Sequence, residues 1–234
     1  MKSLVIIPAY NEQDNIEKVL TDLKKYAPDM DYLVVNDCSK DNTLDILETA
    51  HCSYIDLPVN VGIGGGVQTG YLYAYKNNYD IAIQMDGDGQ HNAEYLNALI
   101  HPIVDGTANM VIGSRYINKE GFQSSFMRRL GIKFLSGLIR ICTGAKILDV
   151  TSGFRAVDKK MIALFAREYA DDYPEPESIV VAARKGAKIT EIPVIMNERV
   201  GGVSSISGLK TVYYMIKVSL SIILLRVSQG EDKW

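Results

Sequence analysis

Short apolar runs alternate with helix-forming segments through residues 1–115 of this 234-residue chain. The runs read SLVIIP, DYLVVND, DIAIQMD and NMVIGS, and each is short enough for a buried strand. Between the first two, one helix face is formed by Ile16, Val19, Leu20 and Leu23. The stretches DNTLDILETA and GGGVQTGYLYAYKNN predict two more helices. This order predicts an α/β fold on a mainly parallel sheet flanked by helices.

Polar side chains follow these predicted strands. They are Tyr10, Asn11, Glu12, Asn36, Asp37, Asp86 and Asp88. The carboxyl ends of parallel strands meet at one edge of a sheet, where ligands of such folds bind. We therefore expect the functional site at this edge.

Composition and charge narrow the class of protein. A net charge of -3 argues against a nucleic-acid-binding protein, because such proteins usually carry a basic surface. Cys38, Cys52 and Cys142 are odd in number and widely spaced, which favours reduced thiols in a reducing compartment. The opening MKSLVIIPAYNE predicts a strand rather than a signal peptide, since its apolar run is short. These features predict a cytoplasmic location.

Two segments of the second half combine apolar residues with a basic stripe. The stripes are Arg129, Lys133, Ser136 and Arg140 in residues 126–142, and Lys210, Tyr214, Lys217 and Ser221 in residues 209–227. Helices of this kind lie in a membrane interface. Residues 209–227 could almost span a bilayer, but Lys217 at their middle would be costly in hydrocarbon. The alternative is that both are core helices of a soluble domain.

Asp86 and Asp88 stand between glycines after an apolar run. Two such carboxylates can hold Mg²⁺ or Mn²⁺, which prefer oxygen ligands and leave coordination positions for phosphate. Gln90 and His91 could add a ligand. An acidic turn is the alternative, because this triplet alone is common.

Six motifs in order resemble glycosyltransferase family 2. They are IPAYNE (7–12), VVNDCSKDNT (34–43), NVGIGGGVQTG (60–70), MDGDGQH (85–91), GSRY (113–116) and DVTSGFRA (149–156). The resemblance covers about residues 3–206. It is strongest to the branch that makes polyprenyl-phosphate sugars, such as dolichyl-phosphate mannose synthases and bacterial undecaprenyl-phosphate glycosyltransferases. It implies a GT-A (Rossmann-like) domain in residues 1–206, with residues 115–150 facing the acceptor or membrane, and a C-terminal amphipathic helix and tail in residues 207–234.

The resemblance also implies residue roles on the donor side. The positions matching the nucleotide-sugar site are Pro8, Tyr10, Glu12, Asp37, Asn60, Gly62, Gly64, Gly65, Asp86, Gly87 and Asp88. Asp86, Asp88 and Gln90 match the metal and diphosphate positions, so Mg²⁺ or Mn²⁺ is the expected cofactor. The chain departs from the family pattern at Asn36, Cys38 and Ile63, which leaves the nucleotide base open.

On the acceptor side, Arg115 matches an arginine that faces the acceptor phosphate, a group that guanidinium binds bidentately. The implied acceptor set is Ser114, Arg115, Arg128, Arg129, Arg199 and Ser204. Arg199 and Ser204 lie in a stretch that resembles the family's mobile acceptor loop, although Ser205 stands where a lysine is usual. A solvated or lipid-facing position is the alternative for Arg128 and Arg129.

The charge of residues 115–155 bears on the choice of acceptor. This stretch has eight basic residues against two acidic ones, which favours an anionic lipid headgroup. A phosphate acceptor needs no general base, whereas a hydroxyl acceptor does. The candidate bases are Glu177 and Asp149, with Glu175 beside the first, although glutamates at a helix start are also typical caps.

We therefore expect an inverting glycosyltransferase in which Asp86, Asp88, Arg115 and Arg199 are catalytic. The expected donor is a nucleotide-diphosphate sugar, with UDP-glucose or UDP-N-acetylglucosamine suggested by resemblance alone. The expected acceptor is a polyprenyl (undecaprenyl) phosphate at the cytoplasmic face of the cell membrane, for cell-envelope polysaccharide. Peripheral attachment to an anionic membrane surface is expected, with a small membrane-protein partner or self-association. The alternatives are transfer to a sugar hydroxyl and a non-catalytic nucleotide-sugar-binding scaffold.

Overall fold

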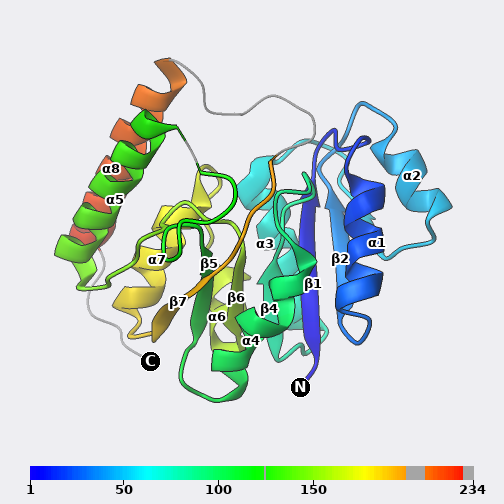
Figure 1. Ribbon diagram of the computed structural model, residues 1–234, viewed down its shortest axis with the longest axis horizontal. Helices are drawn as coiled ribbons and strands as arrows, with labels where there is room; N and C mark the ends of the chain where they lie inside the picture. The colour runs from blue at the N-terminus through cyan, green and yellow to red at the C-terminus, as the bar shows by residue number, and fades with distance from the viewer. Residues whose placement is uncertain (124, 199–208, 229–234) are drawn as a thin grey trace.

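The computed structural model describes residues 1–123, 125–198 and 209–228. In these residues one sheet runs in the order β3-β2-β1-β4-β6-β5-β7 (Figure 1). Its strands are β1 (Ser3–Ala9), β2 (Asp31–Asn36), β3 (Tyr54–Asp56), β4 (Ile81–Gln84), β5 (Met110–Ser114), β6 (Arg155–Asp158) and β7 (Ile189–Pro193). β6 is antiparallel to β4 and β5, and the other neighbours are parallel. The prediction of a mainly parallel sheet is confirmed.

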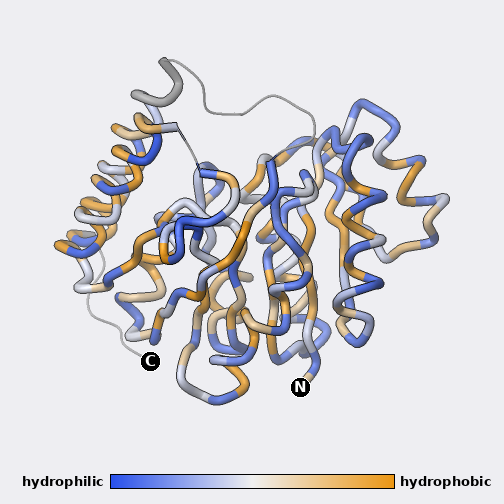
Figure 2. Tube along the Cα trace, in the orientation of Figure 1, coloured by the Kyte–Doolittle hydropathy of each residue, from blue (hydrophilic) through white to orange (hydrophobic). Residues whose placement is uncertain are grey.

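Helices cover both faces of this sheet. They are α1 (Ile16–Tyr26), α2 (Thr43–Thr49), α3 (Gly62–Lys76), the 3-10 turn η1 (Ala93–Tyr95), α4 (Leu96–Val104), α5 (Phe126–Thr143), α6 (Lys159–Phe165), α7 (Pro174–Arg184) and α8 (Leu209–Ser228). Because side chains alternate along a strand, β1 contributes to two cores. Leu4 and Ile6 pack with α3, α5, α6, α7 and α8, while Val5 and Ile7 pack with α1, α2 and α4. Hydrophobic residues accordingly concentrate along the strands (Figure 2).

α5 and α8 lie side by side at one edge of the molecule, and both pack on α7 (Figure 1). Their inner sides are apolar and buried, through Ile132, Leu135 and Ile139 of α5 and Val218 and Ile222 of α8. Large apolar side chains of both helices are also exposed, some on their outer sides and some towards the cleft described below. These are Phe126, Met127, Leu130, Phe134 and Ile141 of α5, and Tyr213, Ile216, Leu220, Ile223, Leu224 and Val227 of α8.

Three residues of the predicted polar stripe of α8, Tyr214, Lys217 and Ser221, face the protein. Lys217 forms an ion pair with Asp172, just before α7, and Ser221 hydrogen-bonds to Glu177. Tyr214 is buried against Tyr173. The exposed side of α8 is therefore its apolar side. Within the described parts of the chain, no helix is both long and apolar enough to cross a membrane. The expected domain boundary at residue 206 lies outside the described residues.

Candidate active site

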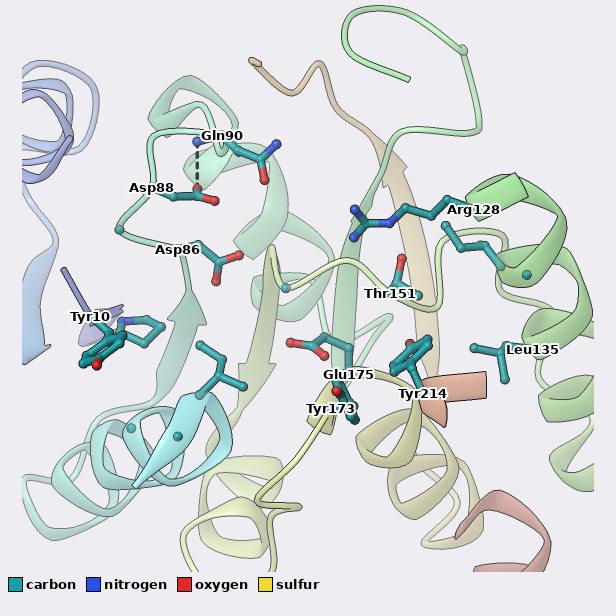
Figure 3. Close-up of a pocket in the computed structure, with 18 of the residues that line it drawn as sticks. Tyr10, Asp86, Asp88, Gln90, Arg128, Leu135, Thr151, Tyr173, Glu175 and Tyr214 are labelled. Atoms are coloured by element: carbon teal, nitrogen blue, oxygen red, sulfur yellow. Dashed lines mark hydrogen bonds between the residues drawn. The ribbon is translucent and has the colours of Figure 1, made fainter. Parts of the chain in front are cut away.

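A cleft of about 1240 Å³ opens at the carboxyl ends of β1 and β4 and continues to α5 and α8 (Figure 3). One end is polar, and its lining includes Pro8, Tyr10, Glu12, Asp37, Asn60, Gly62, Asp86, Gly87, Asp88 and Gln90. The other end is apolar, and its lining includes Met127, Leu130, Phe134, Leu135, Tyr214, Met215 and Ile216. The predicted edge of the sheet thus holds a cleft, and that cleft joins two chemically different halves.

Asp86 and Asp88 lie on the same side of the cleft, with Gln90 beside them (Figure 3). The Asp86 side chain is 33% exposed, whereas Asp88 is nearly buried and accepts a hydrogen bond from the Gln90 backbone N–H at 3.0 Å. The described residues contain no cluster of three or more His, Cys, Asp or Glu side chains that could hold a metal. A cation between Asp86 and Asp88 could take the two carboxylates, the Gln90 amide oxygen and oxygens of a bound phosphate. This hard-oxygen set fits Mg²⁺ or Mn²⁺.

His91, considered as an additional ligand, shapes the loop instead. Its Nδ1 accepts a hydrogen bond from the Asp86 backbone N–H at 3.0 Å, which occupies that nitrogen. Its ring stacks on Phe154 with the centroids 4.8 Å apart. The buried imidazole thereby holds the turn that carries both aspartates.

Asp37 stabilises the start of α3 rather than offering a free carboxylate. Its two oxygens accept hydrogen bonds from the backbone N–H groups of Val61, at 2.7 Å, and Gly62, at 2.9 Å. The Asn60 amide in turn donates to the Asp37 carbonyl oxygen at 3.1 Å. Carboxylates are favourable at a helix N-terminus because they accept otherwise unpaired N–H groups. Asp37 and Asn60 thus shape the polar end of the cleft through this turn.

Gly64 and Gly65, which were predicted for the nucleotide-sugar site, have packing roles. Neither Gly64 nor Gly65 is among the lining residues, whereas Gly62 and Gly66 are. The Gly64 N–H donates to the Asp171 carbonyl oxygen at 3.1 Å. A Cβ on Gly64 would lie 2.0 Å from the carbonyl oxygen of Ala170, and one on Gly65 would lie 2.7 Å from Val61 Cγ2. Gly64 is therefore needed for the close approach of α3 to the chain before α7.

We expect Gly64→Ala to lower the free energy of unfolding by about 1–3 kcal/mol, because the new methyl group collides with backbone that must shift. Gly66→Ala is the matched control in the same helix. A Cβ there meets its nearest atom, Pro8 Cβ, at 3.8 Å, and alanine favours helix. Urea unfolding followed by circular dichroism measures both. Equal stability of the two variants would contradict the packing role of Gly64.

Arg115 and Asp149 form a buried ion pair, which corrects both of their predicted roles. Arg115 Nε and Nη2 each lie 2.7 Å from an Asp149 oxygen, and Arg115 is 7% exposed while Asp149 is fully buried. Burial alone opposes the charged form, but the hydrogen bonds and charge of Asp149 outweigh it and raise the pKa of Arg115. Arg115 is absent from the cleft lining, and Asp149 is no accessible base. Ser114 is buried too, so it does not face an acceptor.

The remaining predicted acceptor residues fall in different places. Arg128 reaches from α5 into the cleft, towards the side that carries the aspartates (Figure 3). Arg129, the next residue, does not line it. Arg199 and Ser204 lie outside the described residues.

Glu175 and Glu177 stand on opposite sides of α7, because positions two apart on a helix do not share a face. Glu175 lines the cleft between the aspartates and Tyr214 (Figure 3), whereas Glu177 turns to α8 and hydrogen-bonds to Ser221. Burial raises the pKa of both carboxyls. Glu177 is therefore wrong as a base in this cleft, and Glu175 is the carboxylate that reaches it.

Arg155 is a buried residue of the site that the sequence reasoning missed. Its side chain is fully buried, and its Nη1 donates to the Glu175 carbonyl oxygen at 3.1 Å and to Ser178 Oγ at 2.6 Å. Its Nε donates to the Ser152 carbonyl oxygen at 3.0 Å. Arg155 thereby ties the loop beneath Asp86 to the start of α7. Its place in the SGFR motif was the available signal.

Comparison with known proteins identifies the family. The model of glycosyl transferase family 2 matches residues 4–165. The chain belongs to glycosyltransferase family 2. The match includes Asp86, Asp88 and the α5 segment, while α7 and α8 lie beyond it.

Relatives of this glycosyltransferase match most of its length. It is 33% identical to the undecaprenyl-phosphate mannosyltransferase of Micrococcus luteus, with 89% of this chain and 88% of that one covered. It is 29% identical to the polyprenol monophosphomannose synthase of Mycolicibacterium smegmatis, and the match covers 93% of this chain and 86% of that one. It is 28% identical to the UDP-N-acetylglucosamine–dolichyl-phosphate N-acetylglucosaminyltransferase of Methanococcus voltae, and the match covers 94% of this chain and 97% of that one.

Among solved structures, the glycosyltransferase is similar to glucosyl-3-phosphoglycerate synthase from Mycobacterium tuberculosis, in complex with Mn²⁺, UDP and phosphoglyceric acid. The TM-score is 0.72 at 18% identity, and the match covers 99% of this chain and 80% of that one. This likeness concerns the fold, and it confirms the GT-A prediction.

Proposed function

We propose that this glycosyltransferase moves a sugar from a nucleotide-diphosphate sugar to a polyprenyl phosphate. The observation that carries the proposal is the single cleft that joins Asp86 and Asp88 to the apolar side chains of α5 and α8. A sugar nucleotide suits the first half, and the isoprenoid chain of a lipid phosphate suits the second. The names of the relatives support the acceptor class. They differ in the sugar, so UDP-glucose or UDP-N-acetylglucosamine stays a proposal for the donor.

The residues of the cleft divide the work of this reaction. Asp86 and Asp88, with Gln90, would hold the cofactor, while Tyr10 and Glu12 line the nucleotide end. A bound Mg²⁺ or Mn²⁺ supplies positive charge that stabilises the leaving nucleotide diphosphate. Arg128, which extends over the cleft from α5, suits the acceptor phosphate in place of the buried Arg115. The phosphate oxygen is already anionic, so it attacks the anomeric carbon without a base, and a single displacement inverts that centre.

Product analysis tests this function. The purified protein is incubated with Mn²⁺, with radiolabelled UDP-glucose, UDP-N-acetylglucosamine or GDP-mannose, and with undecaprenyl phosphate or a soluble oligosaccharide. We expect label in the organic phase with the lipid acceptor only. Label in the oligosaccharide alone would overturn the lipid assignment. No product from any pair would favour the scaffold alternative.

Transfer to a hydroxyl is the second candidate, and Glu175 is the observation that favours it. This carboxyl lies in the cleft, and burial raises its pKa, as is common for a general base. Asp149 and Glu177 do not line the cleft, so neither can serve as the base for transfer to a hydroxyl. The soluble-acceptor arm of the product analysis distinguishes the two reactions.

We also propose that the outer sides of α5 and α8 lie on the cytoplasmic face of an anionic membrane. Exposed apolar side chains cover both helices, and neither helix contains an acidic residue. The two helices end side by side, since Arg226 Nη1 lies 3.3 Å from the Ile141 carbonyl oxygen. A surface that is apolar and basic at once matches a bilayer interface. A small membrane-protein partner or self-association at this surface stays part of the proposal.

We expect the double variant Ile141→Glu with Leu224→Glu to bind anionic vesicles at least about tenfold more weakly, because it adds two negative charges and removes apolar contact. Both residues are exposed, and neither lines the cleft. Val104→Glu, at the end of α4 on the other face of the sheet, is the control and should bind as the wild type does. Co-sedimentation with phosphatidylglycerol vesicles measures binding. Wild-type protein that stays in the supernatant with these vesicles and with native membranes would contradict the attachment.

A further inference from the structure

Asp86 is contacted from inside the protein by Gln84. Gln84 ends β4 two positions earlier, so both side chains lie on the same side of the chain. Gln84 is fully buried, and its Nε2 donates to Asp86 Oδ1 at 3.5 Å. The amide therefore reaches the carboxylate from the core while the cleft opens beyond it.

The other end of the Gln84 amide is occupied by a tyrosine from a distant part of the chain. The Tyr169 hydroxyl donates to Gln84 Oε1 at 3.2 Å. Since this oxygen accepts from Tyr169, the nitrogen is the atom left to face Asp86. Burial raises the pKa of Tyr169 well above its usual range, so its hydroxyl keeps the proton that it donates. Tyr169 is held in turn by edge-on packing against Tyr71 and Phe165.

The backbone of Gly153 closes over the Gln84–Asp86 contact. A Cβ at residue 153 would lie 3.0 Å from Gln84 Nε2 and 3.1 Å from each Asp86 carboxylate oxygen. A side chain at residue 153 would therefore crowd both groups, so glycine suits this close approach of the backbone. Asp86 is thus contacted at its carboxylate by Gln84 and at its backbone N–H by His91.

We propose that Gln84 is a positioning residue that orients the Asp86 carboxylate for the divalent cation, and that Tyr169 orients Gln84. The proposal rests on the metal-binding role of Asp86 and Asp88 given under the proposed function. A neutral amide suits this position for an electrostatic reason. It donates to one carboxylate oxygen without cancelling the negative charge that attracts the cation, as a lysine would. Outer groups of this kind typically orient metal ligands and tune their affinity.

The test measures Mn²⁺ affinity of the full chain in the absence of donor, from the electron paramagnetic resonance signal of free Mn²⁺. Gln84→Met keeps the approximate volume and removes the donor, and we expect about 10- to 100-fold weaker binding. Tyr169→Phe removes one hydroxyl, and we expect a loss of about two- to tenfold. In activity assays with Gln84→Met, the Mn²⁺ concentration for half-maximal rate should rise while kcat at saturating Mn²⁺ is largely retained.

Tyr71→Phe is the matched control for Tyr169→Phe. Tyr71 is fully buried in the same aromatic cluster, and its hydroxyl has no hydrogen-bond partner within the described part of the chain. We expect Tyr71→Phe to bind Mn²⁺ as the wild type does. If both tyrosine variants weaken binding equally, core packing explains the effect and the role of Tyr169 is overturned. The comparison of Tyr169→Phe with Tyr71→Phe also tests the positioning role if Gln84→Met does not fold.

The outcomes separate this inference from the function on which it rests. A wild-type protein that binds no Mn²⁺, either alone or with UDP added to supply the phosphate oxygens, would refute the metal site itself. A wild type that binds Mn²⁺ together with a folded Gln84→Met variant of equal affinity would overturn the positioning role alone. A variant that lowers the melting temperature while binding Mn²⁺ normally would show that Gln84 serves only the core.

Discussion

Asp88→Asn is expected to lower turnover about a thousandfold while the protein stays folded, which corresponds to about 4 kcal/mol of lost transition-state stabilisation. The amide is a weaker ligand for a dication than the carboxylate and removes a negative charge beside the cofactor. Its oxygen can still accept the hydrogen bond from the Gln90 N–H, so the local turn should persist. Initial rates at saturating donor measure the effect, and circular dichroism checks the fold.

Two controls accompany this variant. Asp45→Asn makes the same chemical change at an exposed position in the first turn of α2 and should leave the rate unchanged. Chelator added to the wild type should abolish turnover, and excess Mn²⁺ should restore it. Full activity of the wild type in excess chelator would refute the metal-dependent mechanism.

Arg115→Ala is expected to lower the free energy of unfolding by about 3–5 kcal/mol, because it leaves the Asp149 charge buried without its partner. Asp149 is fully buried and receives both its short side-chain hydrogen bonds from this guanidinium. Thermal and urea unfolding measure the loss. The effect should appear in the protein without any substrate, which separates a structural role from a role in acceptor binding.

The double variant Arg115→Leu with Asp149→Leu provides the comparison. It removes both charges together, so it should recover much of the stability lost by Arg115→Ala. Should Arg115→Ala instead unfold like the wild type and weaken only the use of lipid phosphate, the acceptor role predicted from the motif would be restored.

Much of the fold could be predicted because its signals are local. The apolar run SLVIIP and the three- and four-residue spacing of Ile16, Val19, Leu20 and Leu23 reflect strand and helix geometry. All of these residues except Ser3 and Pro8 lie in the two hydrophobic cores. The polar residues after β1 and β4 could be placed at one edge for the same reason. The antiparallel position of β6 between β4 and β5 could not be predicted, because it depends on pairing with strands distant in the sequence.

The α8 stripe shows how a correct pattern can be assigned to the wrong side. Its spacing was visible in the sequence, and Lys217 and Ser221 do share a face. Only packing shows that this face meets Asp172 and Glu177, so that the apolar side is the exposed one. A hydrophobic pattern defines two sides of a helix, but which side meets the protein depends on what other elements offer it.

The sequence by itself determined the family, and it predicted the sheet edge at which the cleft lies and the pair Asp86 and Asp88 in its lining, because motifs and periodicity are properties of neighbouring residues. The tertiary structure alone decided which charged groups reach the cleft. Arg115 meets Asp149 across 34 residues of chain and is neutralised, and Gln84 meets Tyr169 across 85 residues beneath Asp86. The physical reason is that burial and partner choice fix the state of a polar side chain, and both arise only when distant segments pack together.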